Sequence, residues 1–158
     1  MPGLDREVLA ERVAAVERHL ARVTERLPLR PEDLQPATDA SDAVLLHLWQ
    51  AVQVVIDIAL ALCVQRNLGT PSSYADAFER LAATGDLAPA LATRLTKAAG
   101  FRNLVAHAYG RVDMMRVHEA ARIDRKAVLL RHFFDTAREV TEVRGARQRE
   151  RDVLDHGQ

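Results

Sequence analysis

The sequence predicts an all-α fold, a bundle of about five to six helices, and three observations support this class. Only 4% of the 158 residues are aromatic while Ala and Leu are abundant, which is typical of helices packed through aliphatic side chains. The 7 Gly and 6 Pro gather in a few places, and no proline follows Pro89. Apolar residues recur at three- and four-residue steps, the period of one helix face, and no segment has a strand pattern.

The chain length fits one domain of ordinary size. We place this single helical domain at residues 1–143. Residues 144–158 are charged and weakly patterned, so we expect a frayed C-terminal tail there.

Two long helices are predicted in the first half of the chain. The first covers residues 4–27, whose apolar residues form one stripe, and Pro28 ends it. The second begins at Asp39 or Ser41, either of which can cap it, and runs to about Asn67.

Shorter helices are expected after the Gly69-Thr70-Pro71 stop. A third helix starts after Ser72 or Ser73 and ends at Gly85. Asp86 is expected to cap a fourth helix, with Gly110 as its natural end.

The last predicted helices follow this glycine. Asp113 restarts a helix, and Ile123-Asp124 marks a break with a new cap. The final apolar stripe reaches about Val143.

The second helix is apolar almost all round, more than one neighbour within a small domain can cover. We therefore expect a homodimer. Residues 43–65 have the length of a membrane span, but Asp57 near the middle would be costly in lipid, so we interpret this helix as buried in protein. Its polar residues fall within about 120° of one another around the helix, which predicts a shared seam that is either internally hydrogen-bonded or one wall of a cleft. They are His47, Gln50, Gln53 and Asp57.

Nothing in the sequence indicates secretion or a membrane location. The single Cys63 excludes a disulfide framework and a cysteine metal site, and the N-terminus has no basic-then-apolar pattern. We expect a cytoplasmic protein with Cys63 as a small core residue.

Positive charge is concentrated in the second half of the chain, although the net charge is zero. Residues 94–131 carry 9 basic and 3 acidic side chains, whereas residues 1–93 carry 8 and 13. Such a field attracts polyanions, so we name Arg111 and Arg116 as candidate RNA contacts. The alternative for either arginine is an ordinary solvated helix face.

Arg102, Asn103, His107 and Tyr109 lie within eight residues, inside a helical segment, Gly100–Tyr109, that is otherwise plain. A guanidinium can hold a phosphate in two-pronged fashion, and an imidazole can move a proton near neutral pH. An asparagine can orient the reacting groups, so the set fits phosphodiester cleavage without a metal. No phosphate-binding glycine loop, Ser-His-Asp set or zinc-ligand spacing competes with this interpretation.

Helical geometry separates the two main groups. Arg102 and His107 lie about 140° apart around a regular helix. They converge on one phosphate if the helix loosens near Ala106, if the arginine bends across, or if a second subunit supplies its own copy.

Several blocks of the chain, spread over roughly residues 40–125, resemble in order and spacing the HepT-like ribonuclease toxins of the HEPN superfamily. The block around Arg102 and His107 is the most specific one. The matching blocks are Gln53–Ala59, Gly69–Phe78, Gly85, Gly100–Tyr109 and Val112–Asp113.

The resemblance implies an antiparallel all-helical homodimer that cuts RNA without a metal or other cofactor, in a cleft where two motif copies meet. It also implies an antitoxin of the MntA nucleotidyltransferase type that attaches AMP units to Tyr109. We assign His107 as base or acid, Arg102 as the phosphate clamp, and Asn103 with Asp57 as orienting groups.

Two other functions compete with the nuclease. One is a catalytically silent HEPN domain that binds a nucleotide or regulates a nucleotidyltransferase, and the other is a helical adaptor. For Tyr109 the competing role is packing or stacking on a base. The intact pair of Arg102 and His107 favours the enzyme.

Overall fold

The computed structural model describes residues 4–123 and 128–155, which form six α-helices and two short 3₁₀-helices with no strand among them. The all-helical fold class is therefore confirmed. The elements are α1 (Arg6–Arg26), η1 (Pro31–Asp33), α2 (Asp39–Gln65), α3 (Tyr74–Ala83), α4 (Pro89–Ala108), η2 (Tyr109–Arg111), α5 (Met114–Ile123) and α6 (Val128–Asp155).

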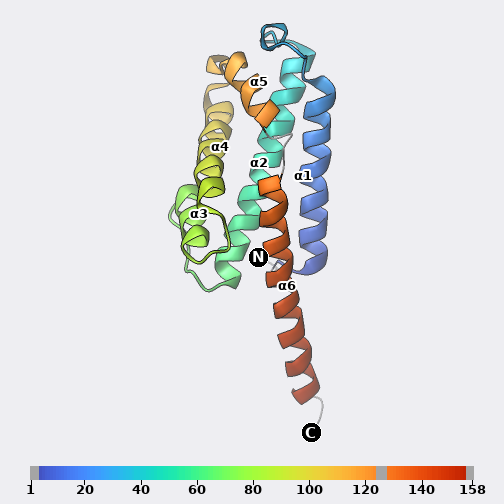
Figure 1. The fold of residues 1–158 in the computed structure, drawn as a ribbon, viewed down its shortest axis with the longest axis vertical. Helices are drawn as coiled ribbons and strands as arrows, with labels where there is room; N and C mark the ends of the chain where they lie inside the picture. Colours follow the sequence, from blue (N-terminus) through green and yellow to red (C-terminus); the bar gives the residue numbers. More distant parts are fainter. Residues whose placement is uncertain (1–3, 124–127, 156–158) are drawn as a thin grey trace.

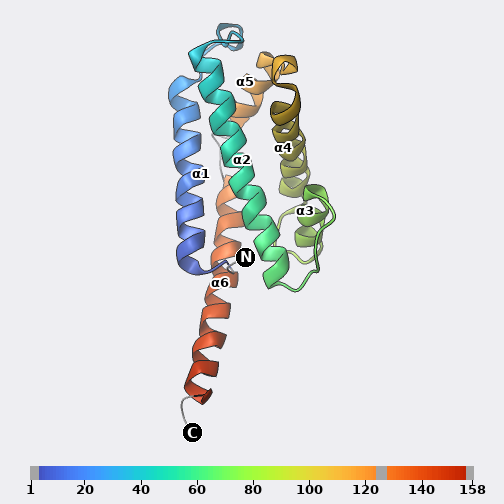
Figure 2. The same ribbon diagram turned by 180° about the vertical axis from the view of Figure 1, so that it is seen from behind.

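The long helices alternate in direction. Helix α1 runs up the bundle, α2 returns beside it, and α4 runs up on the other side of α2 (Figure 1). Helices α5 and α6 descend together and complete an up-down-up-down arrangement, while α3 lies at the lower end beside α4 (Figures 1 and 2). Short connections favour this antiparallel packing.

Side-chain caps start the first two helices close to the predicted positions. The Val8 amide donates to Asp5 Oδ1 over 2.8 Å at the start of α1. At the start of α2 the cap is Thr38, which precedes both predicted candidates, Asp39 by one residue and Ser41 by three, and Thr38 and Ser41 form a reciprocal capping box. A capping residue of this kind contributes about 1 kcal/mol.

The predicted role of Asp86 as a cap is wrong. Helix α4 begins at Pro89 with no side-chain cap, because its N-cap residue is Ala88, which has no side-chain acceptor. The Asp86 carboxylate is buried instead, and it accepts hydrogen bonds from the Arg66 guanidinium and, over 2.7 Å, from Thr84 Oγ1. Asp86 therefore ties the end of α2 to the turn after α3.

The end of α4 also differs from prediction, while the start of α5 agrees with it. Helix α4 ends at Ala108, and η2 carries the chain through Gly110, while Asp113 starts α5 as expected by accepting from the Met115 amide over 2.9 Å. Helix α5 ends at Ile123, and the predicted cap at Asp124 lies outside the described residues.

The last helix is longer than predicted. Helix α6 continues to Asp155 instead of ending near Val143, so residues 144–155 are helical and not frayed, and they project past the lower end of the bundle (Figure 1). One stabilising contact there is the bond of 2.9 Å from Gln148 Nε2 to Asp152, at the i, i+4 spacing that supports a solvated helix.

Helix α2 forms the centre of the core and contacts α1, α3, α4, α5 and α6. It is long and apolar enough to cross a membrane by length and composition alone, but many of its residues are buried inside the bundle, including Cys63. A second apolar cluster closes the end of the bundle that holds η1 and α5. Its buried members are Val23, Leu27, Leu34, Val44, Leu45, Leu48, Val105, Val117 and Ala121.

Candidate active site

The Gly100–Tyr109 motif occupies the last turns of α4 and the start of η2, beside the first half of α2. Val105 is buried in the apolar cluster at that end of the bundle and anchors the segment. Arg102 is half-buried, whereas Asn103 and His107 are exposed. The motif is therefore held rigidly by its apolar residues while its polar residues face outward or along α2.

A chain of hydrogen bonds from α2 orients Arg102. Arg102 Nε donates to Gln53 Oε1 over 2.8 Å, and Gln53 Nε2 donates to Asp57 Oδ1 over 2.9 Å. Asp57 thus fixes the amide of Gln53 with its oxygen toward the arginine. Asp57 is thus linked to Arg102 through Gln53. The orienting role predicted for Asp57 would reach Arg102 by this route.

Two further contacts hold the guanidinium plane. Arg102 Nη1 donates to Asn103 Oδ1 over 3.1 Å, and the guanidinium carbon lies 5.1 Å from the centre of the Trp49 ring. The ring face attracts the cation and limits its rotation. Nη2 makes no hydrogen bond with the described residues, so it can donate to an anion.

His107 lies apart from this cluster. Helix α4 stays regular through both residues, which keeps them about 140° apart around the axis. Across the described ranges, no hydrogen bond or ion pair joins His107 to Arg102. The structure therefore does not bring the two groups together within one subunit.

The predicted polar seam of α2 is divided between two neighbours. Gln53 and Asp57 face α4, but His47 pairs with His19 of α1, with the two Nδ1 atoms 3.0 Å apart and the ring centres 5.3 Å apart. One imidazole must donate and the other accept, so at most one ring can be charged. Burial, followed by the neighbouring His47 and Arg18, lowers the pKa of His19.

Tyr109 is bonded to the start of α2. Its phenol is 48% exposed and donates a hydrogen bond to Asp42 Oδ1. Acceptance by that carboxylate, helped by partial burial, raises the pKa of Tyr109 to about 12. The phenol is therefore protonated at neutral pH, with a carboxylate directly at its oxygen.

A family model described as ribonuclease HepT-like matches residues 16–131, which is most of the chain. The chain belongs to the HepT-like ribonuclease family. The match begins within α1, includes α2 to α5, and ends in the first turn of α6, so it contains the whole motif.

Known proteins resemble this HepT-like chain in sequence and in fold. The mRNA nuclease HepT of Shewanella oneidensis is 28% identical over 108 residues, covering 68% of this chain and 80% of that protein. A crystal structure of a toxin–antitoxin with AMP-PNP has a TM-score of 0.68 at 22% identity, covering 89% of this chain and 99% of the matched chain. The tri-AMPylated Shewanella oneidensis HEPN toxin in complex with an MNT antitoxin has a TM-score of 0.66 at 23% identity. This match covers 87% of this chain and 96% of the matched chain. These two structures share its fold.

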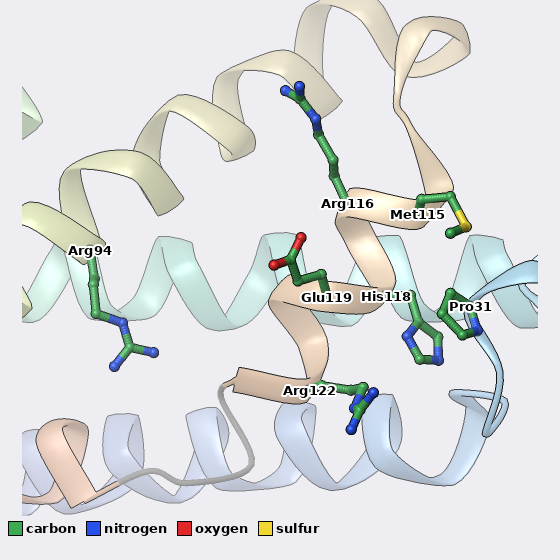
Figure 3. Close-up of a pocket in the computed structure, with 7 residues that line it drawn as sticks. All are labelled: Pro31, Arg94, Met115, Arg116, His118, Glu119 and Arg122. Carbon is green, nitrogen blue, oxygen red and sulfur yellow. The ribbon is translucent and has the colours of Figure 1, made fainter.

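The two predicted RNA contacts of this HepT-like chain lie in different places. Arg111 is exposed in η2, next to Tyr109. Arg116 lines a groove of about 650 Å³, where it points to the opposite side of α5 from Arg122 (Figure 3). The groove is lined by Pro31, Arg94, Met115, Arg116, His118, Glu119 and Arg122 and includes no residue of the motif.

Sequence reasoning missed two residues of the HepT-like site, Trp49 and Asp42. Both belong to a surface that we call the outer face of α2, whose members recur at three- and four-residue steps and include none that is buried. That spacing was a usable signal, because it puts the only tryptophan on the same face as two seam residues. The outer face consists of Asp42, Leu46, Trp49, Gln53, Asp57, Leu60 and Val64.

Proposed function

We propose that this chain is the toxin of a toxin–antitoxin pair and acts as a metal-independent endoribonuclease. Its membership of the HepT-like ribonuclease family supports the nuclease activity, and the relative named mRNA nuclease HepT points to RNA as the substrate. The observation that carries the proposal is the held position of Arg102, with Nη2 left for an anion.

The proposed reaction is attack by the ribose 2′-hydroxyl on the adjacent phosphorus. An imidazole takes the 2′-hydroxyl proton, the new P–O2′ bond forms, and the P–O5′ bond breaks as the resulting imidazolium protonates the departing 5′-oxygen. The products are a 2′,3′-cyclic phosphate and a 5′-hydroxyl. His107 supplies the imidazole, and Arg102 stabilises the charge that develops on the phosphoryl oxygens.

This chemistry requires a second subunit, and the part of the outer face of α2 from Leu46 to Val64, which leaves Asp42 uncovered, is the surface we propose for it. Within one chain Arg102 and His107 lie on different flanks of α4, so Arg102 of one subunit needs His107 of its partner. The outer face carries Leu46 at 52% and Val64 at 67% exposure, and no other helix lies in front of α2 in Figure 2. Burial of such side chains between two copies would stabilise the dimer and place two motifs at one cleft.

RNA would reach this cleft along the positive surface that follows the motif. Arg111 lies two residues after Tyr109, and Arg116 lies in the groove beside α5. We propose both as contacts for the RNA backbone, each contributing to a salt-dependent affinity.

The proposed antitoxin is a nucleotidyltransferase of the MntA type that attaches AMP to Tyr109. The relatives in toxin–antitoxin complexes, one of them tri-AMPylated, support this proposal. Attached phosphates would lie close to the motif, where they would bind the Arg102 clamp and repel RNA.

The decisive experiment incubates the purified chain with a defined RNA in EDTA or in Mg²⁺ and types the RNA ends. We expect equal cleavage in both, with 2′,3′-cyclic phosphate and 5′-hydroxyl ends. His107→Ala should lower the rate by about 10²–10⁴-fold, the range for loss of a general acid or base. Arg102→Ala should lower it by about 10²–10³-fold, as for loss of a transition-state donor.

Arg149→Ala is the matched control, because this arginine is exposed on the projecting part of α6. Circular dichroism of every variant checks that the helices are retained. Mg²⁺-dependent cleavage that leaves 5′-phosphates would refute the mechanism. Absence of cleavage by the wild-type chain under all conditions, together with nucleotide binding, would favour the catalytically silent HEPN domain.

A further inference from the structure

We propose that Asp42 is the general base for modification of Tyr109: it holds the phenol and takes its proton as the nucleotidyl group is transferred. This inference rests on the proposed modification of Tyr109 and names a residue on the toxin itself that the reaction needs. Asp42 contacts the reacting oxygen directly, because the Tyr109 phenol donates to its Oδ1.

The position of this pair suits a reaction carried out by a partner enzyme. Tyr109 is in η2 and Asp42 is in the first turn of α2, so the contact joins two elements that are 67 residues apart in sequence. Both side chains are exposed, which leaves the phenol open to a nucleotide held by another protein.

The state of the phenol explains why a base is needed. With a pKa of about 12, Tyr109 provides almost no phenolate at neutral pH, and a neutral phenol is a weak nucleophile. The carboxylate that stabilises the protonated phenol in the resting protein is also placed to accept the proton during attack.

The step is balanced as follows. The Tyr109 oxygen attacks the α-phosphorus of a nucleoside triphosphate that the partner enzyme supplies, and an O–P bond forms. The bond from that phosphorus to the bridging oxygen of pyrophosphate breaks, and pyrophosphate leaves with the electron pair. The phenolic proton passes to Asp42 Oδ1 and then to water. The product tyrosine has no O–H, so its link to Asp42 is lost.

The test compares Asp42→Asn with Asp39→Asn, another exposed acidic residue in the first turn of α2. Ultraviolet titration of the phenols comes first. The chain has two tyrosines, and Tyr109→Phe identifies the signal of Tyr109. We expect Asp42→Asn to bring the pKa of Tyr109 down from about 12 toward its ordinary value of 10, and Asp39→Asn to leave it in place. An unchanged titration in Asp42→Asn would overturn the proposal.

The second measurement is the rate of AMP transfer to each purified variant by an MntA-type nucleotidyltransferase with ATP and Mg²⁺, followed by mass spectrometry. We expect Asp42→Asn to slow transfer by about 10²-fold or more, and Asp39→Asn to leave the rate unchanged. The residual rate of Asp42→Asn should rise by about tenfold per pH unit below the pKa of its phenol, because phenolate then replaces the missing base.

Two further results of the transfer measurement would overturn the proposal, and they are distinguishable. Transfer at the wild-type rate in Asp42→Asn, with the pKa of Tyr109 lowered, would show that Asp42 only holds the tyrosine. No transfer to wild-type Tyr109 would remove the modification itself, while RNA cleavage by the same preparation would show that the nuclease proposal stands.

Discussion

Arg102 illustrates how single residues of α2 determine what the motif can do. Its guanidinium is held by the charge-assisted hydrogen bond that Arg102 Nε donates to Gln53 Oε1, and a bond to a charged group is worth about 1.5 kcal/mol or more. We expect Gln53→Leu, which keeps the volume but removes the bond, to lower kcat/KM for RNA cleavage by about tenfold, since 1.4 kcal/mol corresponds to a factor of ten. Initial rates on a defined RNA measure this.

Gln148→Leu is the control, because Gln148 bonds only Asp152 among the described residues, on the projecting part of α6. An unchanged rate in Gln53→Leu would mean that Trp49 and Asn103 position the arginine without help. The motif residues themselves were predictable from the sequence, because they lie close together in it. Trp49 and Asp42 were not named, since their contacts with α4 and η2 arise only when distant segments pack.

At the scale of elements, the His19–His47 pair couples the packing of α1 and α2 to pH. The folded-state pKa of His19 lies below its ordinary value of 6.5, so the unfolded chain binds a proton that the folded chain excludes. The contribution of His19 to the free energy of unfolding is then fully present above pH 6.5. It is lost as the pH drops toward the lower pKa that His19 has in the folded state. We expect the melting temperature to decrease over this window, and His19→Asn to flatten the profile.

At neutral pH, His19→Asn destabilises the protein through loss of the hydrogen bond between His19 and His47. Its loss costs about 1 kcal/mol, which lowers the melting temperature of a domain of this size by about 2–4 °C. Thermal unfolding followed by circular dichroism between pH 5 and pH 8 measures the pH dependence of the melting temperature and its decrease in His19→Asn at neutral pH. A profile in His19→Asn that is as steep as that of the wild type would assign the pH dependence to other groups.

Helix positions were largely predictable because amphipathic stripes and caps are local signals. The differences have local causes as well. Asp86 has the sequence position of a cap, but its carboxylate is buried, where it forms an ion pair with Arg66 and accepts a hydrogen bond from Thr84. The extent of α6 was underestimated because its last turns lack an apolar stripe, and their contacts are between charged and polar neighbours on the same helix.

At the scale of the whole molecule, we predict that two subunits share one site. The apolar excess of α2 predicted a dimer, and the exposed leucine on its outer face gives that prediction a test. Leu46→Glu should place a charge in the proposed interface and convert the protein from dimer to monomer in sedimentation. Leu29→Glu is the control, because Leu29 is 91% exposed before η1 and does not belong to the outer face.

Mixing two inactive variants tests the composite site directly. If each working site takes Arg102 from one subunit and His107 from its partner, a heterodimer of Arg102→Ala and His107→Ala chains contains one intact site and one empty site. Random exchange of equal amounts makes half of the dimers mixed, so we expect about a quarter of wild-type activity from a mixture of two nearly inactive proteins. Differently tagged chains confirm that exchange has occurred. If the exchanged mixture stays inactive, both groups of a site come from one chain, and α4 must then distort near Ala106 to bring its own histidine to the phosphate.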